Sequence, residues 1–240
     1  MISKHSLFAK ALAILIATML LKGDLFAFDT QPHLLPVSAN FDTLPPYGKQ
    51  YADLSEKLLF PASNWLFRYY QVIGDPPYDT GLTVYQKPNG AYRLMVKQAR
   101  PAIGDIVMNA FYGRLDLQSS IASLKVETSD RGISDNVAVE LHKLWLTLVQ
   151  RTRPASTVDK RYYIHPATVI LWTKDSRRTV LSGKYPPDAA EHEIFTSLEA
   201  IVDDLVKTSD ANREQRQWLL ARVVKNASRL RRSLEKSTAN

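Results

Sequence analysis

The feature that most limits how this chain can fold is a pair of alternating segments on either side of an Asn-Gly turn. Residues 82–87 and 91–98 each alternate apolar and polar side chains, and residues 88–90 separate them with Pro-Asn-Gly. Because Asn and Gly accept the positive φ angles of tight turns, the pattern predicts a β-hairpin. Its predicted core-facing residues are Leu82, Val84, Leu94 and Val96. Thr83 and Arg93 fall on the opposite face, where polar substitutions are expected to be tolerated.

Three later segments, residues 135–150, 186–207 and 211–234, repeat apolar side chains at helical spacing. Side chains that can cap a helix precede the first at 134–135 and the last at 209–210. The spacing therefore predicts three amphipathic helices. Their predicted buried residues are Val137, Leu141, Leu144, Trp145 and Leu148; Ile194, Leu198, Ile201 and Leu205; and Leu220, Val223, Ala227, Leu230 and Leu234.

The remaining signals are shorter. A helix is predicted over residues 50–59, while the aromatic-rich segment 64–73 is compatible with helix or strand. Further strands are expected at 105–112, 114–118 and 121–127, and a second hairpin is expected from 162–172 through 174–177 to 179–182. Sequential hairpins favour an antiparallel sheet over alternating βαβ units. The sequence thus predicts an α+β fold: an antiparallel sheet built from hairpins, helices packed on it and a basic C-terminal helix.

The N-terminus has the pattern of a secretory signal peptide. Lys4 and Lys10 make its start positive, and the eleven residues 11–21 carry no charge. A helix of that length covers about half of a bilayer core, so it fits a signal peptide better than a membrane span. We expect residues 1–27 to be removed after Ala27 and the mature chain to be periplasmic or secreted. A buried N-terminal helix and an uncleaved anchor are the alternatives.

Beyond the signal, the chain is expected to comprise an extended Pro-rich segment at 28–48, an α+β domain at 49–208 and a basic amphipathic helix at 209–240. The formal net charge of the whole chain is +7. Most of the positive charge of the mature chain lies in residues 211–240, where eight Lys and Arg accompany two Glu. The predicted domain is therefore close to neutral. No segment after the signal is apolar for long enough to span a membrane, so we do not expect a transmembrane mature chain.

The chain contains no cysteine. Disulfides, thiol chemistry and cysteine-ligated metal sites are therefore excluded, as is a lipid-modified N-terminal cysteine. Without disulfides, an exported chain must be stabilised by its packed core.

The sequence gives no positive sign of catalysis, and we lean towards a protein that is not an enzyme. The histidines after the signal, His33, His142, His165 and His192, have no metal-binding spacing, so neither a metal nor a cofactor is expected. Phosphate-binding and dinucleotide-binding loops and a nucleophile elbow are absent. The alternative is a hydrolase that acts on the cell envelope, using His142 or His165 with acidic partners.

Two places are candidates for binding a partner. Residues 75–81 are expected to form a loop stiffened by two prolines, in which Tyr78 and Asp79 offer an aromatic ring and a carboxylate. The C-terminal helix offers Arg229, Arg231 and Arg232 beside its apolar seam.

The leading hypothesis is an exported binding or interaction protein, of which an inhibitor or immunity protein is one form. The C-terminal helix is its expected association surface. The partners considered are a protein or an anionic surface. Nucleic acid is not expected, because the basic residues lack interleaved aromatic rings apart from Trp218.

Overall fold

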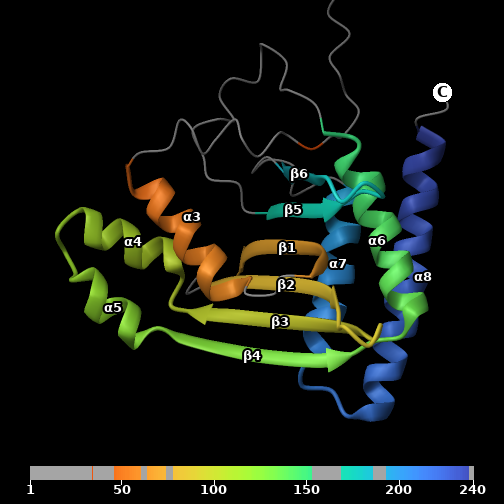
Figure 1. Ribbon diagram of the computed structural model, residues 1–240, viewed down its shortest axis with the longest axis horizontal. Coiled ribbons are helices and arrows are strands. Elements are labelled where there is room, and N and C mark those ends of the chain that lie inside the picture. The colour runs from red at the N-terminus through yellow and green to blue at the C-terminus, as the bar shows by residue number, and fades with distance from the viewer. Residues whose placement is uncertain are drawn as a thin grey trace, which may run out of the picture. The chain divides into compact units, whose positions relative to one another are not determined.

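The computed structural model describes residues 34, 46–60, 64–73, 78–152, 169–185 and 193–237. They all lie in one structural unit, His33–Asn240. They form an α+β fold with a six-stranded antiparallel sheet, as predicted (Figure 1). In chain order the described elements are α3 (Pro46–Leu59), β1 (Trp65–Ile73), β2 (Tyr78–Gln86), β3 (Tyr92–Arg100), α4 (Ile103–Phe111), α5 (Leu117–Ser123), β4 (Lys125–Gly132), α6 (Asp135–Val149), β5 (Val169–Lys174), β6 (Val180–Tyr185), α7 (Glu193–Lys207) and α8 (Arg213–Ser237).

The predicted signal peptide, residues 1–27, lies outside the described residues. Of the segment 28–48 the structure describes Leu34, which is buried in the main core, and residues 46–48, which begin α3. The helix predicted over 50–59 is confirmed and begins four residues earlier than expected. No helix in the described part of the chain combines the length and the hydropathy needed to cross a membrane.

The hairpin predicted from the Asn-Gly turn is confirmed as β2 and β3. Leu82 lies opposite Val96, and Val84 lies opposite Leu94. All four side chains are buried in the main core. Gly90 has a φ of +85°, which is the backbone freedom that the turn requires. Around this hairpin the strand order is β4-β3-β2-β1-β5-β6, so β2 and β1 occupy the centre of the sheet.

The aromatic segment 64–73 forms the central strand β1, which pairs with both β2 and β5. Its side chains are buried on both faces of the sheet, with Phe67 and Tyr69 in one hydrophobic cluster and Tyr70 in the other. A strand that is covered on both sides does not alternate apolar and polar residues. This is why the sequence alone left helix and strand open here.

One face of the sheet is covered by α6, α7 and α8. Trp145 of α6 lies at the centre of this layer and is fully buried. Its ring centroid is 4.5 Å from that of Phe67, and its indole N–H donates to the backbone oxygen of Arg68 at 3.1 Å. The predicted buried face of α6 is confirmed, and Ser134 caps its start by accepting from the Val137 N–H.

Helix α8 packs on this layer through its apolar seam. Val223 and Ala227 are fully buried, Leu230 and Leu234 nearly so, and Leu220 is partly buried against the same core. The seam contacts both α6 and α7, so the C-terminal helix is docked on its own domain.

The start of α8 lies two to three residues later than the sequence suggested. Asn212, not Ser209 or Asp210, is its cap. The Asn212 side chain accepts from the Gln215 N–H at 3.0 Å, and the Gln215 side chain accepts from the Asn212 N–H at 3.3 Å. This reciprocal pair is a capping box. Helix α7 ends at Lys207 as predicted, and residues 186–192 of its expected start lie outside the described residues.

The opposite face of the sheet is covered by α3, and α4 packs beside α3 in the same hydrophobic cluster (Figure 1). Here the strand expected at 105–112 is wrong, because Ile103, Ile106 and Val107 are buried at helical spacing in α4. No strand forms at 114–118, where α5 begins. The strand expected at 121–127 is right only in its second half, where β4 begins at Lys125.

This second covering layer also changes the environment of the hairpin. Thr83 is only 1% exposed, although the hairpin pattern assigned it to a polar face. Arg93 is partly buried and forms an ion pair with Asp130 at 3.0 Å. The solvated face that alternation predicted is therefore wrong for Thr83, because α3 lies against β2 and β3 on this side of the sheet.

The second predicted hairpin is formed by β5 and β6, which pair in antiparallel register. Its turn is held by Asp175, whose side chain accepts from the N–H groups of Arg177 at 2.9 Å and Thr179 at 2.8 Å. Residues 162–168, the first part of the expected strand, lie outside the described residues.

Candidate functional site

The loop predicted over residues 75–81 is wrong from Tyr78 onward, because strand β2 begins there, and residues 75–77 lie outside the described residues. Its candidate residues, Tyr78 and Asp79, face different surroundings. Tyr78 is partly buried, and the guanidinium carbon of Arg100 lies 4.2 Å from its ring centroid. Asp79 is fully buried. Its carboxylate accepts hydrogen bonds from the hydroxyls of Tyr51, at 3.2 Å, and Tyr70.

The other oxygen of Asp79 accepts from the backbone N–H of Ile103, the first residue of α4. The carboxylate thus caps α4 from a neighbouring strand and links α3, β1, β2 and α4. Burial raises the pKa of Asp79 to about 6. The pKa of the Tyr51 hydroxyl is raised well above its ordinary value, chiefly by burial and then by the nearby Asp79 charge. Asp79 therefore lies in the interior, where its hydrogen bonds hold α3, β1 and α4 together, and it is not exposed to a partner.

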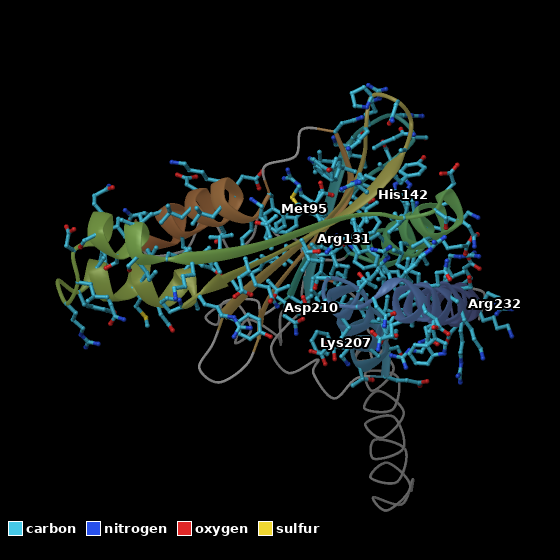
Figure 2. All side chains as sticks on the ribbon, turned by 90° about the horizontal axis from the view of Figure 1, so that it is seen from below. Met95, Arg131, His142, Lys207, Asp210 and Arg232 are labelled. Atoms are coloured by element: carbon cyan, nitrogen blue, oxygen red, sulfur yellow. The ribbon has the colours of Figure 1, made fainter. Side chains whose placement is uncertain are left out.

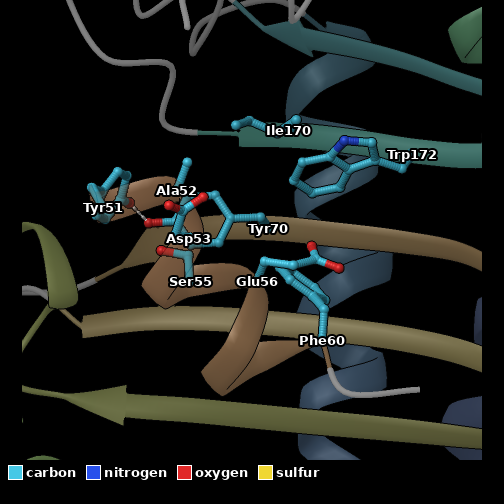
Figure 3. Close-up of a pocket in the computed structure, with 9 residues that line it drawn as sticks. All are labelled: Tyr51, Ala52, Asp53, Ser55, Glu56, Phe60, Tyr70, Ile170 and Trp172. Carbon is cyan, nitrogen blue, oxygen red and sulfur yellow. Dashed lines mark hydrogen bonds between the residues drawn. The ribbon is translucent and has the colours of Figure 1, made fainter. Parts of the chain in front are cut away.

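A pocket of about 270 Å³ adjoins this network, between α3 and strands β1 and β5 (Figure 3). Aromatic rings form much of its wall. In Figure 3 the rings of Phe60 and Trp172 lie on one side and that of Tyr51 on the other. The carboxylates of Asp53 and Glu56, one helical turn apart on α3, also line the pocket. The aromatic wall residues are Tyr51, Phe60, Tyr70 and Trp172.

The second candidate surface is the outer side of α8. The residues that lie on the side of the helix opposite the buried seam recur at intervals of three or four, which is the spacing of one helix face. We call them the basic stripe: Trp218, Arg222, Lys225, Arg229, Arg232 and Lys236. The stripe runs over nineteen residues, and its two ends are about 27 Å apart along the helix. Five of its six members are cationic. In Figure 2 the side chain of Arg232 extends outward from α8.

The three arginines proposed from the sequence do not share one environment. Arg229 and Arg232 are exposed members of the basic stripe. Arg231 lies beside α6 and is partly buried, with ion pairs to Glu140 at 3.7 Å and to Glu235 at 2.7 Å. Arg231 therefore helps to hold α8 against α6, whereas the other two face outward.

The N-terminal end of the basic stripe is ordered by a buried carboxylate. Asp204 of α7 is 3% exposed and accepts two hydrogen bonds from the guanidinium of Arg222, one of them at 2.6 Å. The same guanidinium lies 4.3 Å from the ring centroid of Trp218, which is 59% exposed. An exposed tryptophan that is stacked on a fixed arginine forms a preorganised surface feature.

The histidines give no catalytic geometry in the part of the chain that the structure describes. The Nε2 atom of His142 lies 2.8 Å from the backbone oxygen of Lys174, within hydrogen-bond distance. His33, His165 and His192 lie outside the described residues. Among the described residues, no group of three or more acidic residues or histidines is arranged to hold a metal ion.

Sequence reasoning missed features of both candidate sites. The place of Trp218 and Arg222 in the basic stripe could have been found by projecting α8 along its axis, because both follow from helical spacing. The pocket and the partners of Asp79 had no such signal, since they combine residues from α3, β1, β5 and α4.

The comparisons with known proteins add no relative. No protein-family model matches the chain, and no curated protein and no solved structure matches it.

Proposed function

We propose that this chain is an exported, non-enzymatic binding protein that uses the basic stripe of α8 to bind an acidic surface of a protein partner. The observation that carries the proposal is the placement of the stripe. Four of its cations, Lys225, Arg229, Arg232 and Lys236, are exposed on the side of the helix opposite Val223 and Ala227, which are buried in the domain core. The domain therefore holds the stripe as a rigid, outward row of positive charge.

A protein partner fits this surface better than a membrane. A helix that binds at a lipid surface inserts its apolar face between the lipids. In α8 that face is already packed against α6 and α7, and Trp218 is the large apolar side chain of the stripe that remains exposed. Tryptophan and arginine are enriched among the residues that dominate protein interfaces, so Trp218 and Arg222 supply an anchor within the charged row.

The charge of the stripe would act mainly on recognition and on the rate of encounter. Rows of like charge steer an oppositely charged partner towards the correct patch, and the effect weakens as salt is added. An inhibitor or immunity protein is one form that this chain would take, and its partner would then be the exported enzyme that it binds. Export remains part of the proposal. Intact-mass measurement on protein from the native host is expected to show a chain that begins near Phe28, and a full-length chain recovered from the cytoplasm would contradict export.

The binding proposal is tested with two variants, each of which loses three positive charges, one from the stripe and one from elsewhere on the surface. The stripe variant carries Lys225→Gln, Arg229→Gln and Arg232→Gln. The control carries Lys87→Gln, Arg114→Gln and Arg131→Gln, which are exposed cations outside α8. Poly-L-glutamate serves as the acidic polypeptide probe. At low salt we expect the stripe variant to lose about tenfold or more in affinity and the control to lose clearly less.

A third variant, Trp218→Ala, and anionic lipid vesicles complete the experiment. Loss of poly-L-glutamate affinity in Trp218→Ala, without loss of net charge, would support a built interface. Equal losses in the stripe variant and the control would show that net charge alone is responsible. Vesicle binding as tight as poly-L-glutamate binding, and insensitive to Trp218→Ala, would assign the stripe to a membrane surface instead.

A further inference from the structure

We propose that the aromatic pocket between α3 and strands β1 and β5 is a second, independent binding site, which takes a small quaternary ammonium group. The pocket lies on the face of the sheet opposite α8. It holds about 270 Å³, which is room for several non-hydrogen atoms but smaller than a typical drug-sized site. The chemistry of its wall defines the ligand class.

The wall favours a positive charge. Among the described residues that line the pocket none is cationic, while Asp53 and Glu56 are acidic. The Glu56 carboxylate is paired with Arg68 from beside the pocket, so the preference rests mainly on the aromatic rings and on Asp53. Aromatic faces attract cations through their negative quadrupole, and the attraction grows when the cation is desolvated. The buried Asp79 carboxylate lies behind Tyr51 and Tyr70 and adds negative potential when it is ionised.

The rings in this part of the fold already bind cations within the chain. The guanidinium carbon of Arg68 lies 5.3 Å from the ring centroid of Phe60 and 4.7 Å from that of Trp65. The Lys174 ammonium lies 4.3 Å from the Trp65 centroid. Arg68 also donates to Glu56 at 2.6 Å, so its charge is balanced by a pocket carboxylate. The pocket adjoins a region in which aromatic rings contact Arg68 and Lys174, and in which a carboxylate pairs with Arg68.

The two tyrosines of the wall favour a quaternary over a primary ammonium. The hydroxyls of Tyr51 and Tyr70 are directed to Asp79 and to each other. What these residues offer a ligand is therefore largely ring surface. A primary ammonium needs acceptors for three N–H groups, whereas a methylated ammonium has none to satisfy. Its methyl groups can instead contact Phe60, Ile170 and Trp172, of which Phe60 and Trp172 pack edge to face at 5.6 Å.

The test compares two probes of the same shape by isothermal titration calorimetry on the mature chain. Choline carries the quaternary charge, and 3,3-dimethylbutan-1-ol replaces its nitrogen with carbon. We expect choline to bind about tenfold more tightly than the alcohol. Equal binding of the two probes, or no heat with choline, would overturn the proposal.

Variants locate the binding within the fold. Trp172→Leu keeps apolar bulk but removes the ring, and Asp53→Asn removes one charge; both are expected to weaken choline binding about fivefold or more. Asp203→Asn, at an exposed position on α7, is the matched control and should bind as the unmodified chain does. Choline binding that survives both pocket substitutions, or that falls equally in the control, would overturn the assignment to this pocket.

A final measurement distinguishes the two forms in which a quaternary ammonium could reach the pocket, a lipid headgroup and a free small molecule. Phosphatidylcholine vesicles present the group as a lipid headgroup, whereas choline presents it free. Flotation of the chain with vesicles, reversed by choline, would identify a headgroup ligand. Choline binding without flotation would identify a free amine. Neither outcome depends on the basic stripe, so this proposal and the proposed function can fail separately.

Discussion

The two faces of the sheet are covered in different ways. On one face, α6, α7 and α8 enclose a large, mainly apolar cluster that includes Trp145, Phe67 and Leu82. On the other, α3 and α4 enclose a smaller cluster around Tyr70 and hold polar groups in its midst. Burial of apolar area is the dominant stabilising effect in folding, so the first face contributes most of the stability. The second face contains the pocket.

The polar groups of the second face tie its helices to the sheet. The Lys97 ammonium donates to the backbone oxygen of Leu58 at 3.0 Å, and burial lowers the pKa of Lys97. Arg68 donates to the backbone oxygen of Phe60 at 2.8 Å. Each bond satisfies a carbonyl near the end of α3 that the helix itself leaves open. The comparison shows that one sheet can carry a hydrophobic layer for stability and a polar layer that keeps a cavity and a buried carboxylate.

The largest expected effect is on the free energy of unfolding, and it compares Val84 and Thr83, adjacent residues of β2 that face opposite sides of the sheet. Val84→Asp places a carboxylate in the core beneath α6 and should lower the free energy of unfolding by about 4 kcal/mol or more. Thr83 points to the other face, and its buried hydroxyl has no hydrogen-bond partner in the described part of the chain. Thr83→Val should therefore stay within about 1 kcal/mol of the unmodified chain, or stabilise it. Urea denaturation measures both changes, and similar losses would contradict the difference between the faces.

The next effect concerns Asp79 and depends on pH. The pKa of Asp79 is raised from 3.8 to about 6 by burial, so the folded chain binds this proton more tightly than the unfolded chain. Its contribution to stability is fully present below about pH 4 and is lost as the pH rises through 6, in total about 3 kcal/mol. Asp79→Asn cannot ionise. Relative to the unmodified chain it should gain stability from pH 4 to pH 7, and parallel pH profiles of urea denaturation would show that Asp79 is not the titrating group.

The smallest effect tests how closely α3 lies against the sheet. A Cβ atom added at Gly81 would lie 2.7 Å from the Leu59 Cβ and 3.1 Å from the Phe60 ring. Gly81→Ala should therefore push α3 outward and cost about 2 kcal/mol. Gly132→Ala, on β4 with no atom within 4 Å of the added Cβ, is the matched control and should change the melting temperature little. A melting temperature for Gly81→Ala equal to that of the control would mean that α3 is loosely packed.

Several elements could be predicted from local patterns. The hairpin around Gly90, the buried face of α6 and the seam of α8 each have one side towards the core and one towards a more polar layer or solvent. That contrast repeats with the period of the backbone, so it can be seen in a single segment. The cationic character of the outer face of α8 follows from the same spacing.

Other features depend on contacts that no single segment contains. Strand β1 is buried on both faces, which removes the alternation that would have identified it. Helix α4 is capped by Asp79, a residue twenty-four positions away from Ile103, so its start carries no local signal.

The candidate sites likewise combine features that a local pattern predicts with features that only contacts between distant segments decide. Arg229 and Arg231 are equivalent in sequence, but only the packing of α8 against Glu140 of α6 turns one outward and the other inward. The pocket arises where α3 lies over β1 and β5, and its wall exists only when these distant segments meet. Periodicity shows which side of an element is apolar, whereas the identity of the neighbour on that side is set by the cooperative packing of the whole domain.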